Sequence, residues 1–382
     1  MKVLFIGARL FDEVGYFAKS KGIETILTES NPDSHNLNLA DEYHIVSRGM
    51  KQPMELAITK DVDAVVPLIG IDKPLRDVAL MKEKLESEYN LPVVASGIKA
   101  TTIAIDKFKT KKFLFENKIK TPKYDKLTRT QYHGSELQIE YPVVLKQPEG
   151  QGGVGVQISN SKTDTQKYLK TFPSSMVEEY IKGAEISVEV LRWNQKSVPL
   201  VGVYKGDTTL TGTHPIKKTR SAPVNFSDLD NRELLKLAGR IIDKLGACGT
   251  SEVEFIYNQE NGLYTLEINT RPSGTRFLTY CSSNINPMHQ LVNMALGEWH
   301  PKKIELEMKN YSALEVSIPP ETLRSNPLLR NNDNQKRQIL TEEKPYIIHG
   351  PEKASRITIR SSHINKSREI MKNLKLGPFP ES

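Results

Sequence analysis

The sequence predicts a multidomain protein that joins an α/β domain with a parallel sheet to α+β domains. Short apolar runs alternate with amphipathic helical segments over roughly the first hundred residues, which is typical of a doubly wound parallel sheet. Residues 142–191 change to β-branched, alternating segments, which favour an α+β arrangement. The chain of 382 residues is long enough for two or three such domains.

The first predicted domain, residues 1–98, is Rossmann-like. Its predicted strands are residues 3–6, 25–28, 64–69 and 91–96, and its predicted helices include residues 12–22 and 73–87. A dinucleotide site would be expected directly after the first strand. That position carries Gly7 but lacks the further glycines of the dinucleotide fingerprint, which counts against NAD binding there.

Two further domains are predicted, residues 99–305 and residues 306–382. The larger one contains a lid subdomain at about residues 120–185 and opens with a helix over residues 103–117. Its later part has a helix over residues 232–246, followed by two strands, residues 251–258 and 263–269, joined by a turn. The C-terminal domain is predicted to be small and α+β.

The composition argues against several classes of protein. With 38% hydrophobic and 26% charged residues the chain is globular, and we find neither a run of about 18 apolar residues nor a signal-like start. We therefore expect a cytoplasmic protein that does not enter a membrane. Cys248 and Cys281 lack metal-ligand spacing and are expected to be buried thiols. The net charge of +7 is spread along the chain, so nucleic-acid binding is only a minor alternative.

Residues 146–156, KQPEGQGGVGV, match the dinucleotide pattern G-x-G-x-x-G at Gly150, Gly152 and Gly155. A strand precedes them, but the alternating stretch VQIS follows, where a dinucleotide site needs the N-terminus of a helix. The stretch is therefore predicted to be a glycine hairpin whose backbone N–H groups approach phosphate oxygens, with Lys146 supplying charge. An ordinary β-turn is an alternative of about equal weight.

Three oxygen-bearing side chains fall on the two strands of the predicted hairpin. Glu254 lies in the first strand, and Glu267 and Asn269 lie two residues apart in the second, so the last two face the same side. Carboxylate and amide oxygens on one face suit a Mg²⁺ ion that also holds phosphate oxygens. Arg271 has the same facing and offers a fork of donors to an anion. A solvated sheet face with ordinary ion pairs is the alternative.

Two other segments carry weaker candidates. The segment MVEEYIKGAEISVEV can offer groups to an adenine edge from Glu178, Glu179, Tyr180 and Ile181, and to ribose hydroxyls from Glu185, although glutamates at a strand end are more often solvated. A basic stretch from Lys205 to Arg220 surrounds His214. Weaker candidates for holding a substrate carboxylate are Ser273, Arg276, His214 and Arg220.

Taken in order, these segments resemble the ATP-grasp superfamily, in particular the branch shared by the carbamoyl-phosphate synthetase large subunit, biotin carboxylase and amino-acid ligases. The resemblance covers roughly residues 1–300. It rests on four segments: IDKFKTKKFL around Lys107, VVLKQPEGQGGVGV, VEEYIKGAE, and the paired strands that contain VEF and LEINTRPSG. It implies the ATP-grasp fold, with a Rossmann-like domain before it and a small domain after it.

The resemblance also implies a role for each matching residue. Lys107 and Lys146 contact the ATP phosphates, and the loop with Gly150, Gly152, Gly153 and Gly155 closes over them. Glu178 binds the adenine amino group by its side chain, Glu179 and Ile181 add backbone contacts, and Glu185 holds the ribose. Glu254, Glu267 and Asn269 hold Mg²⁺, and Arg271 contacts the transferring phosphate or the acyl phosphate. The implied cofactors are ATP and two Mg²⁺ ions, with Mn²⁺ as a substitute.

The residues after Asn269 narrow the implied chemistry. Biotin carboxylases continue with a Gln-Val-Glu stretch associated with bicarbonate, whereas this chain continues PSGTR, similar to ligases that join a carboxylate to an amine. The chain also has one ATP-grasp unit, whereas carbamoyl-phosphate synthetase large subunits have two. The resemblance thus implies a ligase that forms an amide through an acyl phosphate, from an amino acid or small peptide, with Lys107, Lys146 and Arg271 as catalytic residues.

Two alternatives remain open from the sequence. One is carboxyphosphate or carbamate chemistry like that of carbamoyl-phosphate synthetase, and the other is a non-catalytic ATP-binding partner protein. The expected partners are small-molecule carboxylates and amines. The family commonly forms dimers, so a homodimer is one candidate assembly.

Overall fold

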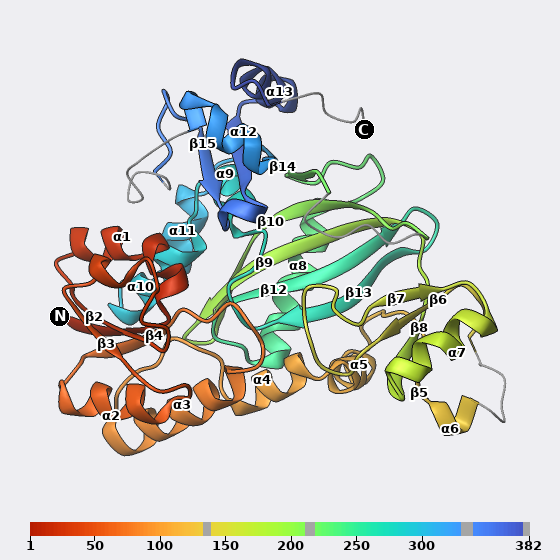
Figure 1. The fold of residues 1–382 in the computed structure, drawn as a ribbon, viewed down its shortest axis with the longest axis horizontal. Coiled ribbons are helices and arrows are strands. Elements are labelled where there is room, and N and C mark those ends of the chain that lie inside the picture. The colour runs from red at the N-terminus through yellow and green to blue at the C-terminus, as the bar shows by residue number, and fades with distance from the viewer. Residues whose placement is uncertain (133–138, 211–217, 330–338, 377–382) are drawn as a thin grey trace.

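The computed structural model describes residues 1–132, 139–210, 218–329 and 339–376. They form a parallel sheet near the N-terminus, a small antiparallel sheet, and a long antiparallel sheet through the middle of the molecule (Figure 1). This mixture of a parallel sheet with antiparallel sheets and helices agrees with the predicted fold class. Among the helices in the described ranges, none is long and apolar enough to cross a membrane.

Four short apolar strands form the N-terminal sheet. In the order β3-β2-β1-β4, they are β1 (Lys2–Ile6), β2 (Glu24–Glu29), β3 (Glu42–Ile45) and β4 (Ala64–Pro67). All pairs are parallel, and Leu4 lies opposite both Ile26 and Val65. A parallel sheet needs cover on both faces. The nearby helices are α1 (Gly15–Ser20), α2 (Lys51–Thr59) and α3 (Leu75–Tyr89), with 3₁₀ turns at Ala8–Glu13 and Leu37–Leu39.

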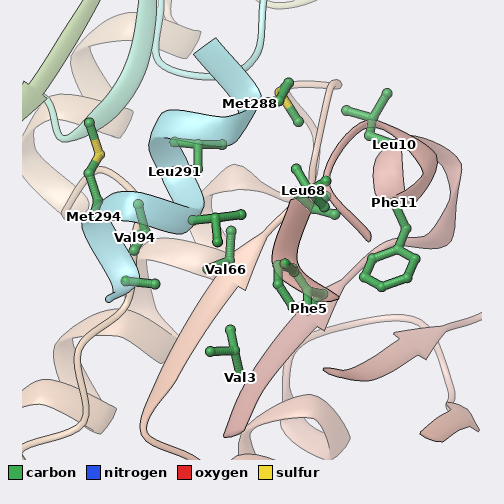
Figure 2. Close-up of a cluster of buried hydrophobic side chains, with 14 of the residues drawn as sticks. Val3, Phe5, Leu10, Phe11, Val66, Leu68, Val94, Met288, Leu291 and Met294 are labelled. Atoms are coloured by element: carbon green, nitrogen blue, oxygen red, sulfur yellow. The ribbon is translucent and has the colours of Figure 1, made fainter. Parts of the chain in front are cut away.

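One face of this sheet packs against α10 (Pro287–Ala295), which comes from much later in the chain (Figure 2). Leu291 and Met294 of α10 lie in one buried cluster with Phe5 and Val66. Complete burial of a leucine or methionine side chain stabilises a fold by about 1.5–3 kcal/mol. The packing therefore fixes the N-terminal sheet to the segment just beyond the PSGTR sequence.

The predicted strand at residues 91–96 is not formed. Val93 alone pairs with Val65, as a single parallel bridge. The physical reason is a proline on each side of this bridge, since Pro92 has no N–H to donate before it and Pro67 of β4 has none to donate after it. The prediction from apolar residues alone was wrong at this point.

The predicted helix over residues 103–117 is interrupted. The structure has α4 (Ile98–Ile105) and α5 (Lys107–Glu116), with Asp106 between them. The Asp106 carboxylate accepts hydrogen bonds from the backbone N–H groups of Phe108 and Lys109 at 2.9 and 3.1 Å, which makes it the N-cap of α5. The break places Lys107 at the first position of α5.

The small antiparallel sheet lies in the predicted lid region and has the order β5-β8-β6-β7. Its strands are β5 (Tyr124–Thr128), β6 (Val143–Lys146), β7 (Gln157–Ser159) and β8 (Ser174–Glu179), and its helices are α6 (Arg129–Tyr132) and α7 (Lys162–Thr171). Leu145 of β6 lies opposite Gln157 of β7 in an antiparallel pair. The glycine stretch therefore connects two strands, as predicted.

The central sheet contains eight strands in the order β13-β12-β9-β10-β11-β14-β16-β15. The five that surround the predicted site are β9 (Ala184–Trp193), β10 (Lys196–Asp207), β11 (Arg220–Ala222), β12 (Gly249–Asn258) and β13 (Gly262–Asn269). Helix α8 (Asn231–Leu245) covers one face, where Leu234 and Ile241 share a buried cluster with Val188. Asp230 caps the start of α8, and Gly246 ends it with a φ of 73°.

The C-terminal strands extend the central sheet, because β14 pairs with β11. This sheet connects the predicted C-terminal domain directly to the preceding one. The remaining helices and strands after residue 275 are β14 (Ser312–Ser317), β15 (Tyr346–His349), β16 (Arg356–Ser361), α9 (Arg276–Ser283), α11 (Pro301–Glu307), α12 (Pro320–Ser325) and α13 (Ile364–Asn373), with 3₁₀ turns at Pro327–Leu329 and Glu352–Ala354.

Glu315 of β14 ties these strands together by charge. Its carboxylate is fully buried and contacts Arg356 at 2.6 Å, His349 at 3.2 Å and Arg220 at 3.4 Å. Burial alone would raise the pKa of Glu315, but His349 and the two guanidinium groups outweigh it and lower this pKa to about 2.

We expect Glu315→Gln to lower the unfolding temperature at pH 7, because the folded state favours the ionised carboxylate. The folded pKa lies below the unfolded value of 4.5, so the contribution is present above pH 4.5 and is lost as the pH falls toward 2. The ionised Glu315 contributes roughly 3 kcal/mol to the free energy of unfolding. Thermal melts of both proteins between pH 7 and pH 2 measure this, with the exposed Glu305→Gln as control. A pH-independent difference would contradict the assignment.

Candidate active site

The strands β9, β12 and β13 present one polar face. Opposite the α8 face, the alternate residues of β9 are Glu185, Ser187 and Glu189, those of β12 are Glu252 and Glu254, and those of β13 are Glu267 and Asn269. Glu254 lies directly opposite Glu267, and Glu252 lies opposite Asn269. The predicted hairpin and the common facing of Glu254, Glu267 and Asn269 are therefore confirmed by the register.

The carboxylates of Glu254 and Glu267 have different electrostatic surroundings. Glu254 forms an ion pair with Lys205 at 2.7 Å, which outweighs burial and lowers the pKa of Glu254. Burial raises the pKa of Glu267, and the negative charge of Glu254 adds to this, although Lys107 and Lys146 partly offset it. Glu267 therefore lies where a further positive charge would be favourable.

These residues fit a Mg²⁺ ion that takes some of its ligands from the protein and the others from the phosphate oxygens of a nucleotide. Asn269 Nδ2 donates to Glu254 Oε1 at 3.3 Å, so the amide and the carboxylate are adjacent. Over the described ranges there is no group of three His, Cys, Asp or Glu side chains able to hold a metal by itself. Magnesium does not require one, because it is usually bound by one or two carboxylates together with phosphate oxygens and water.

Arg271 lies beside this acidic group, immediately past β13. Its Nε contacts Asp72 Oδ1 at 2.5 Å, and its Nη2 donates to Asn269 Oδ1 at 3.4 Å. Asp72 comes from the N-terminal domain, between β4 and α3, so the N-terminal domain contributes the carboxylate that contacts Arg271. Sequence reasoning missed Asp72 because its neighbours Ile71 and Lys73 form no recognisable motif.

The glycine loop between β6 and β7 reaches the same place. Lys107 Nζ donates to the carbonyl of Gly150 at 2.8 Å, which brings the predicted lysine and the predicted loop together. The side chain of Gln151 accepts from the backbone N–H of Asp72 at 2.7 Å. Gly150, Gly152, Gly153 and Gly155 all have positive φ. The loop thus lies between Lys107 and the N-terminal domain.

Glu178 at the end of β8 is buried and holds two lysines. One carboxylate oxygen contacts Lys111 of α5, and the other contacts Lys146 of β6. The resemblance implied a contact between this carboxylate and adenine, but in the structure both oxygens are engaged by lysines. Burial would lower the pKa of Lys146, and the charge of Glu178 outweighs it and raises that pKa. Burial lowers the pKa of Lys111 to about 8 despite the same carboxylate.

The segment that follows β8 connects the small sheet to β9. The backbone N–H of Glu179 donates to the carbonyl of Lys123 at 2.8 Å, Tyr180 is half-buried, and Ile181 is buried. Glu185, the predicted ribose ligand, forms an ion pair with Lys218 at 2.8 Å. This segment follows directly after Glu178, whose carboxylate contacts Lys146.

The weaker candidates have protein partners. Arg276 forms an ion pair with Glu13 of the N-terminal domain and donates to the carbonyl of Ser273 at 2.7 Å. Ser273 Oγ donates to Glu189 at 3.0 Å. Arg220 is buried and directed to Glu315, away from solvent. His214 lies outside the described residues.

Two buried carboxylates on the polar face were missed, Glu189 and Glu252. Glu189 accepts from Thr250 Oγ1 at 2.6 Å, and Glu252 accepts from Thr275 Oγ1 at 2.8 Å. Burial, with the neighbouring Glu252 charge, raises the pKa of Glu189 to about 7. The alternation of Glu185 with Glu189 and of Glu252 with Glu254 was the signal that could have identified both.

Comparison with known proteins identifies the family and the fold. Residues 104–275 match a family described as the ATP-grasp domain. A protein of Methanobrevibacter smithii named carbamoyl-phosphate synthase is 43% identical over 366 residues, covering 94% of this chain and 96% of the relative. The 3-methyl-D-ornithine–L-lysine ligase of Methanosarcina acetivorans is 29% identical over 300 residues, which are 78% of this chain and 74% of the relative.

A solved structure shows the same fold. The L-amino acid ligase of Bacillus licheniformis superposes with a TM-score of 0.76 at 17% identity, over 98% of this chain and 96% of that one. Enzymes of the ATP-grasp family generally use ATP with Mg²⁺. The resemblance drawn from the four sequence segments is confirmed. The chain therefore belongs to the ATP-grasp family of ADP-forming carbon–nitrogen ligases.

Proposed function

We propose that this protein joins the carboxylate of one small molecule to the amine of another, with an amino acid or small peptide among its substrates. The observation that carries the proposal is the facing pair Glu254 and Glu267, which lies within electrostatic reach of Lys107 and Lys146 and beside Arg271. Two carboxylates for Mg²⁺ and three cations for phosphate are the groups that phosphoryl transfer from ATP requires.

The nucleotide would lie between the small sheet and the polar face of the central sheet. Lys107 and Lys146 would bind its phosphates, with the glycine loop above them. The base would lie against Glu179, Tyr180 and Ile181, with Glu185 at the ribose. Glu254, Glu267 and Asn269 would hold Mg²⁺, for which we propose two ions. The metal would offset charge on the phosphates and align them for attack.

The first chemical step is attack of a substrate carboxylate oxygen on the γ-phosphorus, which forms an acyl phosphate and ADP. The amine of the second substrate then attacks the acyl carbon, the C–O bond to phosphate breaks, and the released phosphate takes up the proton that the nitrogen loses as the amide forms. Arg271 lies where its guanidinium can stabilise the negative charge that develops on the transferred group and on the carbonyl oxygen. Contact of the glycine loop with the N-terminal domain would exclude water from the acyl phosphate.

The glycine loop gives the first test of this assignment. Gly152 has a φ of 66° with open space around it, so Gly152→Pro strains the backbone and stiffens the tip without a side-chain clash. We expect kcat to fall by about a hundredfold because closure is impaired, with ADP affinity changed by about threefold or less. Rapid-quench measurement of acyl-phosphate formation and calorimetry of ADP binding separate the two.

The matched control for this variant is Gly22→Pro. Gly22 has a φ of 71° and open space around it, but it lies in the N-terminal domain between α1 and β2. It introduces similar backbone strain and also removes the Gly22 N–H donor to the Lys19 carbonyl, but both changes lie away from the loop, so the kcat of the folded protein should stay near that of the parent protein. Equal losses of acyl-phosphate formation and ADP binding in Gly152→Pro would count against a lid role.

The function itself is tested by pairing amino acids and small peptides with one another and measuring Mg²⁺-dependent ADP release. The proposal expects release that requires both an amine and a carboxylate substrate, together with an amide product detected by mass spectrometry. ADP release that needs bicarbonate in place of an organic acid would overturn it. That outcome would favour carbamate chemistry, for which the name of the Methanobrevibacter smithii relative is the supporting observation.

A further inference from the structure

Lys111 is the buried cation of the site that the proposed mechanism does not use. It lies four residues after Lys107 on the same side of α5, and the residue as a whole is only 1% exposed. Its Nζ contacts Glu178 and donates to Thr121 Oγ1 at 2.6 Å. Thr121 in turn donates to the carbonyl of Thr265 at 2.7 Å. The ammonium of Lys111 is therefore held in place on the side of Glu178 away from solvent.

Lys146 is the more accessible of the two cations that share Glu178. Its side chain is 14% exposed, against 2% for Lys111. Lys146 is also under the influence of the Glu267 and Glu254 carboxylates, which face the proposed metal and phosphate positions. Lys111 is also influenced by the charge of Glu267, but its buried Nζ contacts both Glu178 and Thr121. The more accessible Lys146 is therefore the lysine that can turn between Glu178 and a phosphate group.

Such a turn would be costly if Lys146 were the sole partner of Glu178. Breaking a buried ion pair by withdrawing one partner is strongly unfavourable, because the remaining charge is left uncompensated. With Lys111 in contact with the other carboxylate oxygen, Glu178 stays paired after Lys146 leaves. The cluster of two lysines and one glutamate also carries a net positive charge, which favours an incoming anion.

We propose that Lys111 is a positioning residue that holds the charge of Glu178, so that Lys146 is free to bind the nucleotide phosphates. The inference rests on the proposed nucleotide site and deepens it. It makes affinity for phosphate, rather than for adenosine, dependent on a side chain that contacts no part of the nucleotide.

The test is Lys111→Met, studied in the full-length protein. Affinities for ADP and for adenosine are measured by calorimetry. Where adenosine binds weakly, its affinity is obtained by titrating ADP into protein that already contains adenosine. We expect ADP to bind about thirtyfold more weakly, since Lys146 is now required at Glu178, while adenosine affinity changes by about threefold or less. A general packing defect would weaken both ligands together.

The neighbouring variant Lys112→Met is the matched control. Lys112 also lies on α5, but it is exposed and pairs only loosely with Glu116 at 3.8 Å. It should bind both ligands as the parent protein does. Lys111→Arg keeps the positive charge and should retain much of the ADP affinity.

A double variant keeps the inference testable if Lys111→Met does not fold. Lys111→Met with Glu178→Gln removes both buried charges, so Lys146 is no longer held back. Because the glutamine side chain carries no charge for Lys111 to hold, the double variant should have the same ratio of ADP to adenosine affinity as Glu178→Gln alone. An equal ratio in Lys111→Met and the parent protein, or a lower ratio in the double variant than in Glu178→Gln, would overturn the inference. Failure of the parent protein to bind ADP would instead overturn the proposed nucleotide site.

Discussion

Glu267→Gln is expected to lower ADP formation by about a thousandfold or more, equivalent to about 4 kcal/mol, while the fold stays intact. The carboxylate of Glu267 lies directly opposite Glu254 and is the one that burial and like charge hold at a raised pKa. It is therefore the group that gains most from a cation. A glutamine has the same shape but loses the negative charge that Mg²⁺ requires, so metal-dependent turnover should fail at all substrate concentrations.

The same reasoning predicts the effect on stability. Replacing Glu267 by Gln removes repulsion with Glu254 in the metal-free protein, so the unfolding temperature without Mg²⁺ should be unchanged or higher. Adding Mg²⁺ to the ADP-bound protein should raise the unfolding temperature of the parent protein further, and this Mg²⁺-dependent increase should be lost in the variant. Glu260→Gln, in the exposed turn of the same hairpin, is the matched control. Full activity in Glu267→Gln would reject the metal assignment.

The β12–β13 hairpin shows what local sequence can predict. Alternating side chains with a short polar turn predict the pairing, and the common facing of Glu267 and Asn269 follows from a two-residue period. Glu254 shares that face because the register shifts by one residue between Glu254 and Phe255, which the period alone does not predict. The glycine loop was predictable for the same reason, because the strand after it excludes a helix. Periodicity alone failed at Pro92, which has no N–H to donate to a neighbouring strand. It also failed at Asp106, which caps the start of a new helix.

The partners of the site residues were not predictable in this way. Asp72 and Arg271 are 199 positions apart, and Lys111 meets Glu178 only because α5 packs beneath the small sheet. No local pattern distinguishes Lys111 from its exposed neighbour Lys112, since the difference is set by which side of α5 faces Glu178. Long-range packing decides which charges are buried, and burial decides which charges matter.

Replacing Arg271 by Met should lower kcat by about a hundredfold to a thousandfold and leave the KM for ATP nearly unchanged. The guanidinium is positioned by Asp72 and Asn269 beside the proposed metal ligands, so it can act on charge that develops during the reaction. An interaction made only in the transition state lowers kcat and kcat/KM equally. Steady-state kinetics at saturating amine and carboxylate measure this pattern.

Two comparisons separate catalysis from the loss of an ion pair. Arg192→Met breaks a similar pair with Asp243 at the far end of β9, where the side chain is 12% exposed against 11% for Arg271, and it should not change kcat. Asp72→Asn combined with Arg271→Met removes the carboxylate that the single variant leaves unpaired. If the double variant regains stability but not turnover, the defect belongs to the chemistry. Recovery of both would make Arg271 a structural link between the N-terminal domain and β13.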